Sequence, residues 1–96
     1  MTDDATLILR GRYATYASER RALMKTLQGR MQDVQNCAHI VLRTQSGSLA
    51  ADALLDAENH IKAARSCFAR IAELNDAMDE LRESAWGTKT GGEDGE

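Results

Sequence analysis

The sequence predicts an all-α protein, a hairpin of two long antiparallel helices that pack against each other as a coiled coil. Three observations lead to this prediction. The chain of 96 residues contains no proline, apolar residues recur every three or four positions along two tracts, and one short polar segment separates the tracts. A chain of this length forms one domain at most, so we expect a single hairpin over residues 1–87.

The first tract predicts a helix over about residues 4–44. One stripe of residues runs along it, namely Tyr13, Tyr16, Arg20, Leu23, Leu27, Met31, Val34, Ala38 and Val41. The beginning of this helix stays open between helix, strand and disorder for residues 4–14, because Gly11 disfavours a helix interior by about 1 kcal/mol. Residues 6–9 also suit a short strand, and Thr15 or Ser18 are alternative first residues.

The segment Gln45-Ser46-Gly47-Ser48 predicts the turn at residues 45–48, followed by a second helix over about residues 49–86. We expect Ser48 to cap that helix. Its stripe consists of Ala53, Ala57, Ile61, Ala64, Phe68, Ile71, Leu74, Met78, Leu81 and Ala85. Gly87 suits a helix end, and the acidic, glycine-rich residues 88–96 predict a disordered tail.

A turn centred near Gly47 fixes which residues of the two helices face each other. Arg20 is expected opposite Leu74 and Asn75, whereas Cys37 and Cys67 fall about 15 Å apart along the axis, too far for a disulfide. Four polar residues interrupt the apolar stripes, and we interpret them as seam residues that set the helix register. They are Arg20, His60, Asn75 and Arg82.

Charge is distributed unevenly along the chain, although the net charge is only −3. Residues 10–43 contain seven basic and two acidic residues, and residues 49–96 contain five basic and eleven acidic residues. Opposite charges on neighbouring antiparallel helices favour their pairing, with each exposed ion pair contributing only about 0.2–1 kcal/mol.

A two-helix hairpin buries only one side of each helix, so further apolar residues need another partner. We predict a protein-binding face that combines apolar residues with basic residues that steer an acidic partner. The face consists of Met24, Ile40, Leu42, Leu54 and Leu55 with Arg21, Lys25 and Arg43. The partner is a second copy, which would complete a four-helix bundle, or another protein. The predicted function is therefore that of a non-catalytic protein–protein interaction module of the adaptor, co-chaperone or inhibitor type.

The alternative is a small nucleic-acid-associated protein that uses the basic first helix. Its candidate phosphate contacts are Arg10, Arg12, Arg21, Lys25 and Arg30. Tyr13 and Tyr16 lie between them and offer rings for stacking on bases. The acidic second helix and the negative net charge make this the second choice.

The sequence contains no pattern typical of catalysis, of a metal or cofactor site, or of a known family. Cys37 and His39 are two residues apart and point away from each other on a helix. There is no glycine-rich phosphate loop, secretory signal or apolar run of about 20 residues. We accordingly expect a cytoplasmic protein that has no enzyme activity, cofactor, small-molecule substrate or membrane contact.

Overall fold

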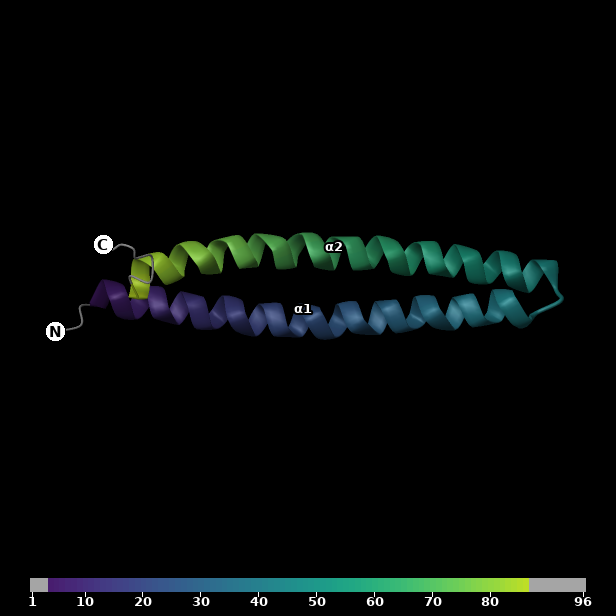
Figure 1. Ribbon diagram of the computed structural model, residues 1–96, viewed down its shortest axis with the longest axis horizontal. Helices are drawn as coiled ribbons and strands as arrows, with labels where there is room; N and C mark the ends of the chain where they lie inside the picture. Colours follow the sequence, from purple (N-terminus) through teal and green to yellow (C-terminus); the bar gives the residue numbers. More distant parts are fainter. Residues whose placement is uncertain (1–3, 87–96) are drawn as a thin grey trace, which may run out of the picture. The chain divides into compact units, whose positions relative to one another are not determined.

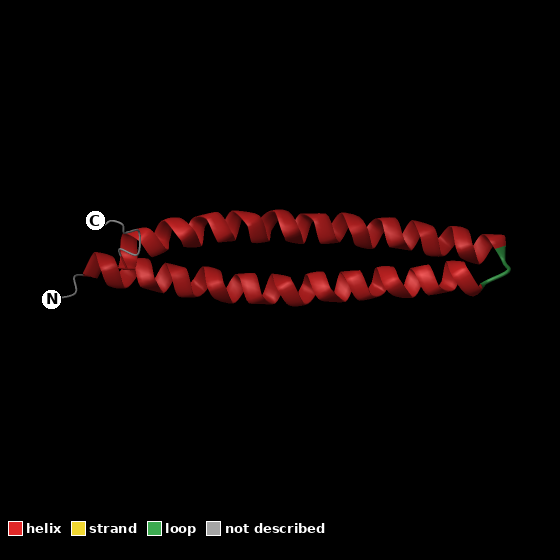
Figure 2. Cartoon of the chain, viewed as in Figure 1, coloured by secondary structure: helices red, strands yellow, loops and turns green. Residues whose placement is uncertain are grey.

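The computed structural model describes residues 4–86, which form two α-helices and a short loop (Figures 1 and 2). Helix α1 spans Asp4–Arg43, helix α2 spans Gly47–Trp86, and residues 44–46 connect them. The helices form a hairpin, so the predicted all-α hairpin fold is confirmed. The tail of residues 88–96 and Gly87 lie outside the described residues.

Helix α1 includes the segment whose structure the sequence left open. Residues 4–14 are helical, and Asp4 in the first turn places a negative charge near the positive end of the helix dipole. The helix continues through Gly11 and Gly29 without interruption. In this segment Arg10 and Tyr13 contact Trp86 of α2, and such packing supports a helix where intrinsic preference alone is weak.

The loop ends in a side-chain cap on α2. The Ser46 hydroxyl accepts a hydrogen bond from the backbone N–H of Leu49 at 3.2 Å, and the Ser46 carbonyl accepts one from Ala50 at 3.0 Å. These are the bonds of an N-cap residue. The expectation that Ser48 caps this helix was therefore wrong, because Gly47 and Ser48 already lie in its first turn.

Removing this cap should weaken the hairpin measurably. We expect Ser46→Ala to lower the free energy of unfolding by about 1 kcal/mol, since the Leu49 N–H loses its acceptor. Ser48→Ala is the matched control and should change it by less than about 0.5 kcal/mol. Thermal unfolding followed by far-ultraviolet circular dichroism measures both variants, and equal losses would contradict the assignment of Ser46 as the cap.

The described residues divide into two compact units. The terminal unit contains residues 4–21 and 71–86, and the loop unit contains residues 22–70. Within each unit a segment of α1 and a segment of α2 lie side by side in opposite directions (Figure 1).

In the terminal unit the core is formed by Ile71, Leu74 and Ala85 of α2, of which Leu74 is only 1% exposed. Beside this core, the Arg20 Nε donates a hydrogen bond to Asn75 Oδ1 at 2.7 Å. The sequence register placed these two residues opposite each other, and the contact is present.

Aromatic and basic side chains pack against one another in the terminal unit near the end of α2. The rings of Tyr13 and Trp86 meet edge to face with centroids 5.1 Å apart, and the Arg10 guanidinium lies 5.2 Å from the Trp86 ring centroid. Arg10 also donates to the Ala85 carbonyl at 3.4 Å, and Arg82 donates to the Tyr13 hydroxyl at 2.9 Å. That hydrogen bond, with smaller Coulombic contributions from Tyr13 and Asp79, raises the pKa of the Arg82 guanidinium.

In the loop unit the seam consists mainly of small side chains. Cys37, Ala53 and Ala64 are buried. A polar layer lies among them, where the Arg30 Nη1 donates to the His60 Nδ1 at 3.0 Å and the Asp33 Oδ2 lies 3.7 Å from the same nitrogen. Cys37 and Cys67 are both free thiols. The seam thus follows a strict seven-residue repeat, including its polar members.

Four residues that the sequence placed in the apolar seam lie outside it, so this part of the prediction was wrong. Met31, Ala38, Ile61 and Phe68 are exposed, and their chain neighbours Arg30, Cys37, His60 and Cys67 lie in the seam as half-buried or buried residues. A strict repeat of seven residues favours these neighbours even though they are less apolar.

Candidate protein-binding face

Beside the seam, each helix of the loop unit has a further apolar stripe at a third position of the seven-residue repeat. In heptad terms the buried residues occupy positions a and d, and the residue after each d position is position e. On α2 the e positions are Leu54, Ile61 and Phe68, and on α1 they are Met24, Met31 and Ala38. Because the helices are antiparallel, the e positions of both helices lie on the same side of the pair. With Leu42 beside them they form what we call the groove face.

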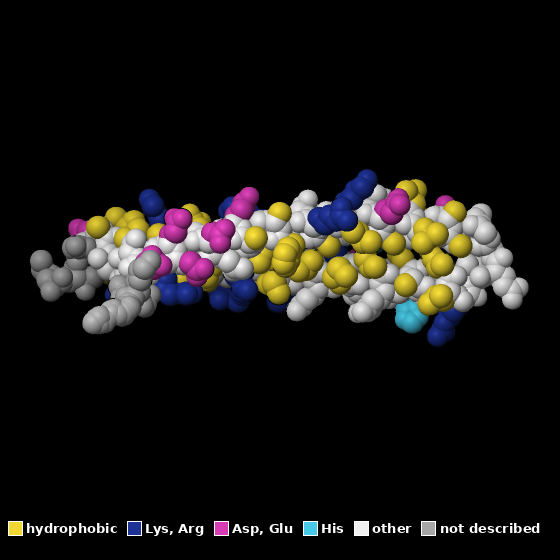
Figure 3. Space-filling model, turned by 45° about the horizontal axis from the view of Figure 1, so that its top comes forward, with side chains coloured by type: hydrophobic (Ala, Val, Ile, Leu, Met, Phe, Trp, Pro, Cys, Tyr) yellow, Lys and Arg dark blue, Asp and Glu magenta, His cyan; other side chains and the backbone are white. Residues whose placement is uncertain are grey.

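The groove face contains two hollows, both lined mainly by apolar side chains. The first has a volume of about 400 Å³, and the second of about 270 Å³. The first is lined by Leu27, Met31, Ile61, Ala64, Arg65, Phe68 and Ala69. The second is lined by Val34, Cys37, Ala38, Val41, Leu42, Leu54 and Ala57. Figure 3 shows apolar side chains gathered on one face, toward the end at which α1 and α2 are joined.

The large side chains of the groove face are strongly exposed. Phe68 is 63% exposed, Leu54 is 55% exposed and Leu42 is 81% exposed. Single exposed leucines are ordinary, but a contiguous apolar surface with hollows is the usual mark of an interaction site.

The opposite side of the loop unit is more polar. Its positions, heptad position g, immediately precede the a residues of the seam. They are Thr26, Asp33, Ile40, Asp56, Ala63 and Arg70. The hairpin therefore has one side suited to water and one side suited to further helices.

The structure separates the residues that the sequence grouped into one interface. Leu42 and Leu54 line the second hollow together, and Met24 is half-buried on α1. Leu55 is 57% exposed but lines neither hollow of the groove face. Ile40 lies with Arg43 in a separate shallow depression.

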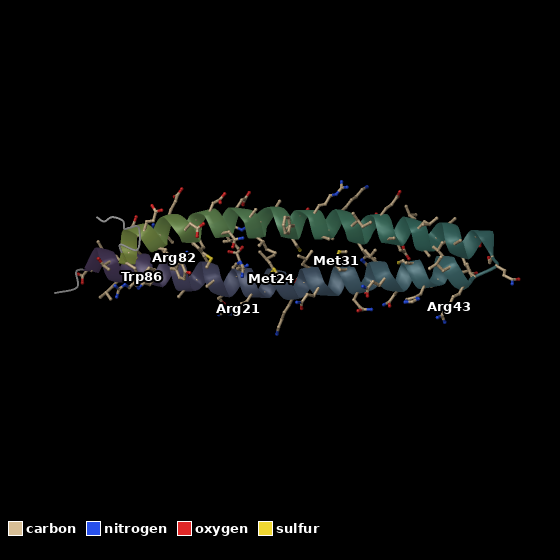
Figure 4. The ribbon with its side chains drawn as sticks, in the orientation of Figure 1. Arg21, Met24, Met31, Arg43, Arg82 and Trp86 are labelled. Carbon is tan, nitrogen blue, oxygen red and sulfur yellow. The ribbon has the colours of Figure 1, made fainter. Side chains whose placement is uncertain are left out.

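The basic residues of the predicted interface are exposed. Arg21 and Lys25 lie on the surface of α1. In Figure 4 Arg43 extends away from α2, whereas Met31 lies on the side toward α2. The charge of Arg43 is consequently not part of one continuous patch with the groove face.

The groove face could have been found in the sequence from a stricter repeat. Accepting the most apolar residue at each three- or four-residue step selects Ile61 and Phe68 for the seam, at the expense of regular spacing. Requiring alternate steps of four and three selects His60 and Cys67 and releases the more apolar pair as a separate stripe.

Two of the predicted nucleic-acid residues have their guanidinium groups engaged within the hairpin. Arg10 contacts Trp86 and the Ala85 carbonyl, and Arg30 donates to His60. Arg12, Arg21 and Lys25 are exposed.

Within residues 4–86 no three side chains of the kinds His, Cys, Asp and Glu are close enough together to hold a metal ion. Neither described helix has a stretch with the length and apolar character needed to cross a bilayer.

The fold and the groove face define the class of protein: a helical hairpin with an exposed apolar stripe beside its seam. Comparison of the chain with protein-family models, curated proteins and solved structures finds no match.

Proposed function

We propose that the protein is a non-catalytic protein–protein interaction module that binds partner helices on its groove face. The observation that supports this proposal is the further apolar stripe at heptad position e. Helices that are apolar only at a and d suit a two-stranded coiled coil, and helices that are also apolar at e suit a bundle. Two additional helices on the groove face would complete a four-helix bundle.

The energy available from covering the groove face is large for a chain of this size. Burying a side chain such as Leu, Ile, Met or Phe completely contributes about 1.5–3 kcal/mol. Phe68, Leu54 and Leu42 are all more than half exposed, so most of that contribution is still unused in the isolated hairpin. Partner side chains that fill the two hollows would add packing contacts as well.

Exposed basic residues support an acidic partner. Arg21, Lys25 and Arg43 are on the surface of α1 and contribute to the rate of encounter more than to final affinity. Nucleic-acid binding would use the same exposed cations together with Arg12. Retention on DNA or RNA that falls with salt and disappears when Arg12, Arg21 and Lys25 are changed to glutamate would favour nucleic-acid binding instead.

Two adjacent leucines provide a matched test of the groove face. Leu54 and Leu55 are 55% and 57% exposed, but only Leu54 lines a hollow of that face. We expect Leu54→Asp to weaken association at least about tenfold, which corresponds to about 1.4 kcal/mol, because a carboxylate would be buried against the partner. Leu55→Asp should leave association unchanged. Both variants should keep the helical content of the wild-type chain.

Association is measured as solution mass across a dilution series and as the set of proteins that co-purify with each variant. Loss with Leu54→Asp but not with Leu55→Asp supports the groove face. If both variants associate like the wild-type chain, or lose association equally, the groove face is not the binding surface.

A further inference from the structure

We infer that the groove face is covered by a second copy of this chain, related by a two-fold axis that lies in the interface, perpendicular to the helices, at the level of Met31 and Ile61. In this dimer each helix packs antiparallel to the same helix of the other copy. The inference rests on the proposed function and names its partner and register. It is argued below from the spacing of large and small side chains, from the level of the two helices and from charge.

The groove face of α2 is complementary to itself about Ile61. Phe68 lies seven residues after Ile61, and Leu54 lies seven residues before it. A two-fold axis at Ile61 therefore places Phe68 of each copy over the hollow beside Leu54 of the other. That hollow of about 270 Å³ is lined in part by the small side chains of Cys37, Ala38 and Ala57, which leave space for a ring. The exposed Phe68 thus has a receptor in the second copy, and the arrangement occurs twice, as two-fold symmetry requires.

Helix α1 has a centre at nearly the same level. Met24 lies seven residues before Met31 and Ala38 lies seven residues after it, so the axis brings a long side chain against a short one. The hydrogen bond from Arg30 to His60, and the approach of Asp33 to the same nitrogen, bring the residue before Ile61 to the level of residues 30–33. Met31 and Ile61 also line one hollow. The two centres lie within about one helical turn of each other along the helices, close enough for one axis to serve both.

Charge on the edge of α2 distinguishes this register from others. Glu58 and Arg65 lie on either side of Ile61 along the helix, and both line a depression with Ile61 and Lys62. The two-fold axis at Ile61 sets Glu58 of each copy near Arg65 of the other, which gives two pairs of opposite charge. The corresponding residues of α1 are Gln28 and Gln35, which are neutral and able to hydrogen-bond. If α2 packed instead on α1 of the second copy, the charges of Glu58 and Arg65 would both face these neutral glutamines.

The test is a charge exchange between copies. Glu58→Arg and Arg65→Glu each convert both intermolecular pairs into like charges, so each variant alone should dissociate at least about tenfold more readily. An equimolar mixture of the two variants restores opposite charges at both positions in the mixed dimer. We expect its dissociation constant to return to within about threefold of the wild-type value. The doubly exchanged chain E58R/R65E should also recover.

Asp56→Arg is the matched control, since it makes the same charge change on the polar side of α2 and should leave the dissociation constant unchanged. Sedimentation equilibrium at low salt measures every species, and circular dichroism verifies that each variant keeps its helices. A wild-type chain that stays monomeric at all concentrations overturns the inference. So does a mixture that associates no better than its components.

These outcomes differ from a failure of the proposed function. If Leu54→Asp disrupts the dimer but neither single charge variant does, the groove face binds a second copy in another register, and this inference alone is overturned. If the chain is monomeric and Leu54→Asp selectively loses a co-purifying protein, the occupant is a different partner. If Leu54→Asp and Leu55→Asp are equivalent, the proposed function fails first.

Discussion

Replacing Leu74 by alanine is expected to lower the free energy of unfolding by about 2–4 kcal/mol. Leu74 is 1% exposed and is the largest fully buried side chain among residues 4–86. Alanine removes its apolar contacts with the terminal unit and leaves a cavity that two helices can close only in part. Small domains have little stability in reserve, so a loss of this size should open the terminal unit at temperatures at which the wild-type chain is folded.

Urea unfolding followed by circular dichroism and by Trp86 fluorescence measures this effect at a fixed protein concentration. Leu55→Ala is the matched control, because the same atoms are removed from a residue that is 57% exposed. It should change the free energy of unfolding by less than about 0.5 kcal/mol. Equal effects of the two substitutions would show that Leu74 does not lie in a packed core.

Replacing Gly11 and Gly29 together by alanine is expected to raise the free energy of unfolding by about 2 kcal/mol. Both residues lie inside α1, and a Cβ atom added at either one meets no atom within 4 Å. Each alanine should contribute about 1 kcal/mol, because it restricts the unfolded chain and favours the helix without a steric penalty.

Thermal and urea unfolding of the double variant measure the gain, and the two single variants show whether the gains add. Gly47→Ala is the control, because Gly47 is the first residue of α2, where helix preference matters less than in the interior. Its gain should be smaller than that of either α1 substitution. A double variant no more stable than the wild-type chain would mean that one of the glycines serves a close approach to a partner.

The contacts that the sequence predicted are those in which spacing and chemistry agree. Arg20 reaches Asn75, because an antiparallel register with its turn near Gly47 sets these two residues opposite each other. Hydrophobic periodicity and a single polar break were enough to predict two helices and their direction.

The groove face was missed where spacing and chemistry disagree. Ile61 is more apolar than His60, and Phe68 is more apolar than Cys67, so apolarity alone assigns the wrong member of each pair to the seam. In a hairpin each helix has only one neighbour, and geometry then buries the a and d positions whatever their chemistry. His60 is accommodated there by the hydrogen bond from Arg30, a contact that a list of apolar residues does not reveal.

The helix cap was also placed wrongly, for a local reason. Ser46 and Ser48 are equally good N-cap residues, and the glycine between them adopts helical as readily as turn conformations. The hydroxyl of Thr44, which accepts a hydrogen bond from the Ser46 N–H at 3.1 Å, favours the earlier start. Such a bond depends on the loop conformation and leaves no pattern in the sequence.

The division into two units gives the chain a separate spectroscopic or chemical reporter in each. Trp86 is the only tryptophan and lies in the terminal unit against Tyr13 and Arg10, so its emission follows that unit. Cys37 and Cys67 are the only cysteines, and both lie in the loop unit as buried and half-buried thiols. Their rate of reaction with a thiol reagent therefore follows the opening of the loop unit. Comparing the two signals in the wild-type chain shows whether the terminal unit and the loop unit open separately or together.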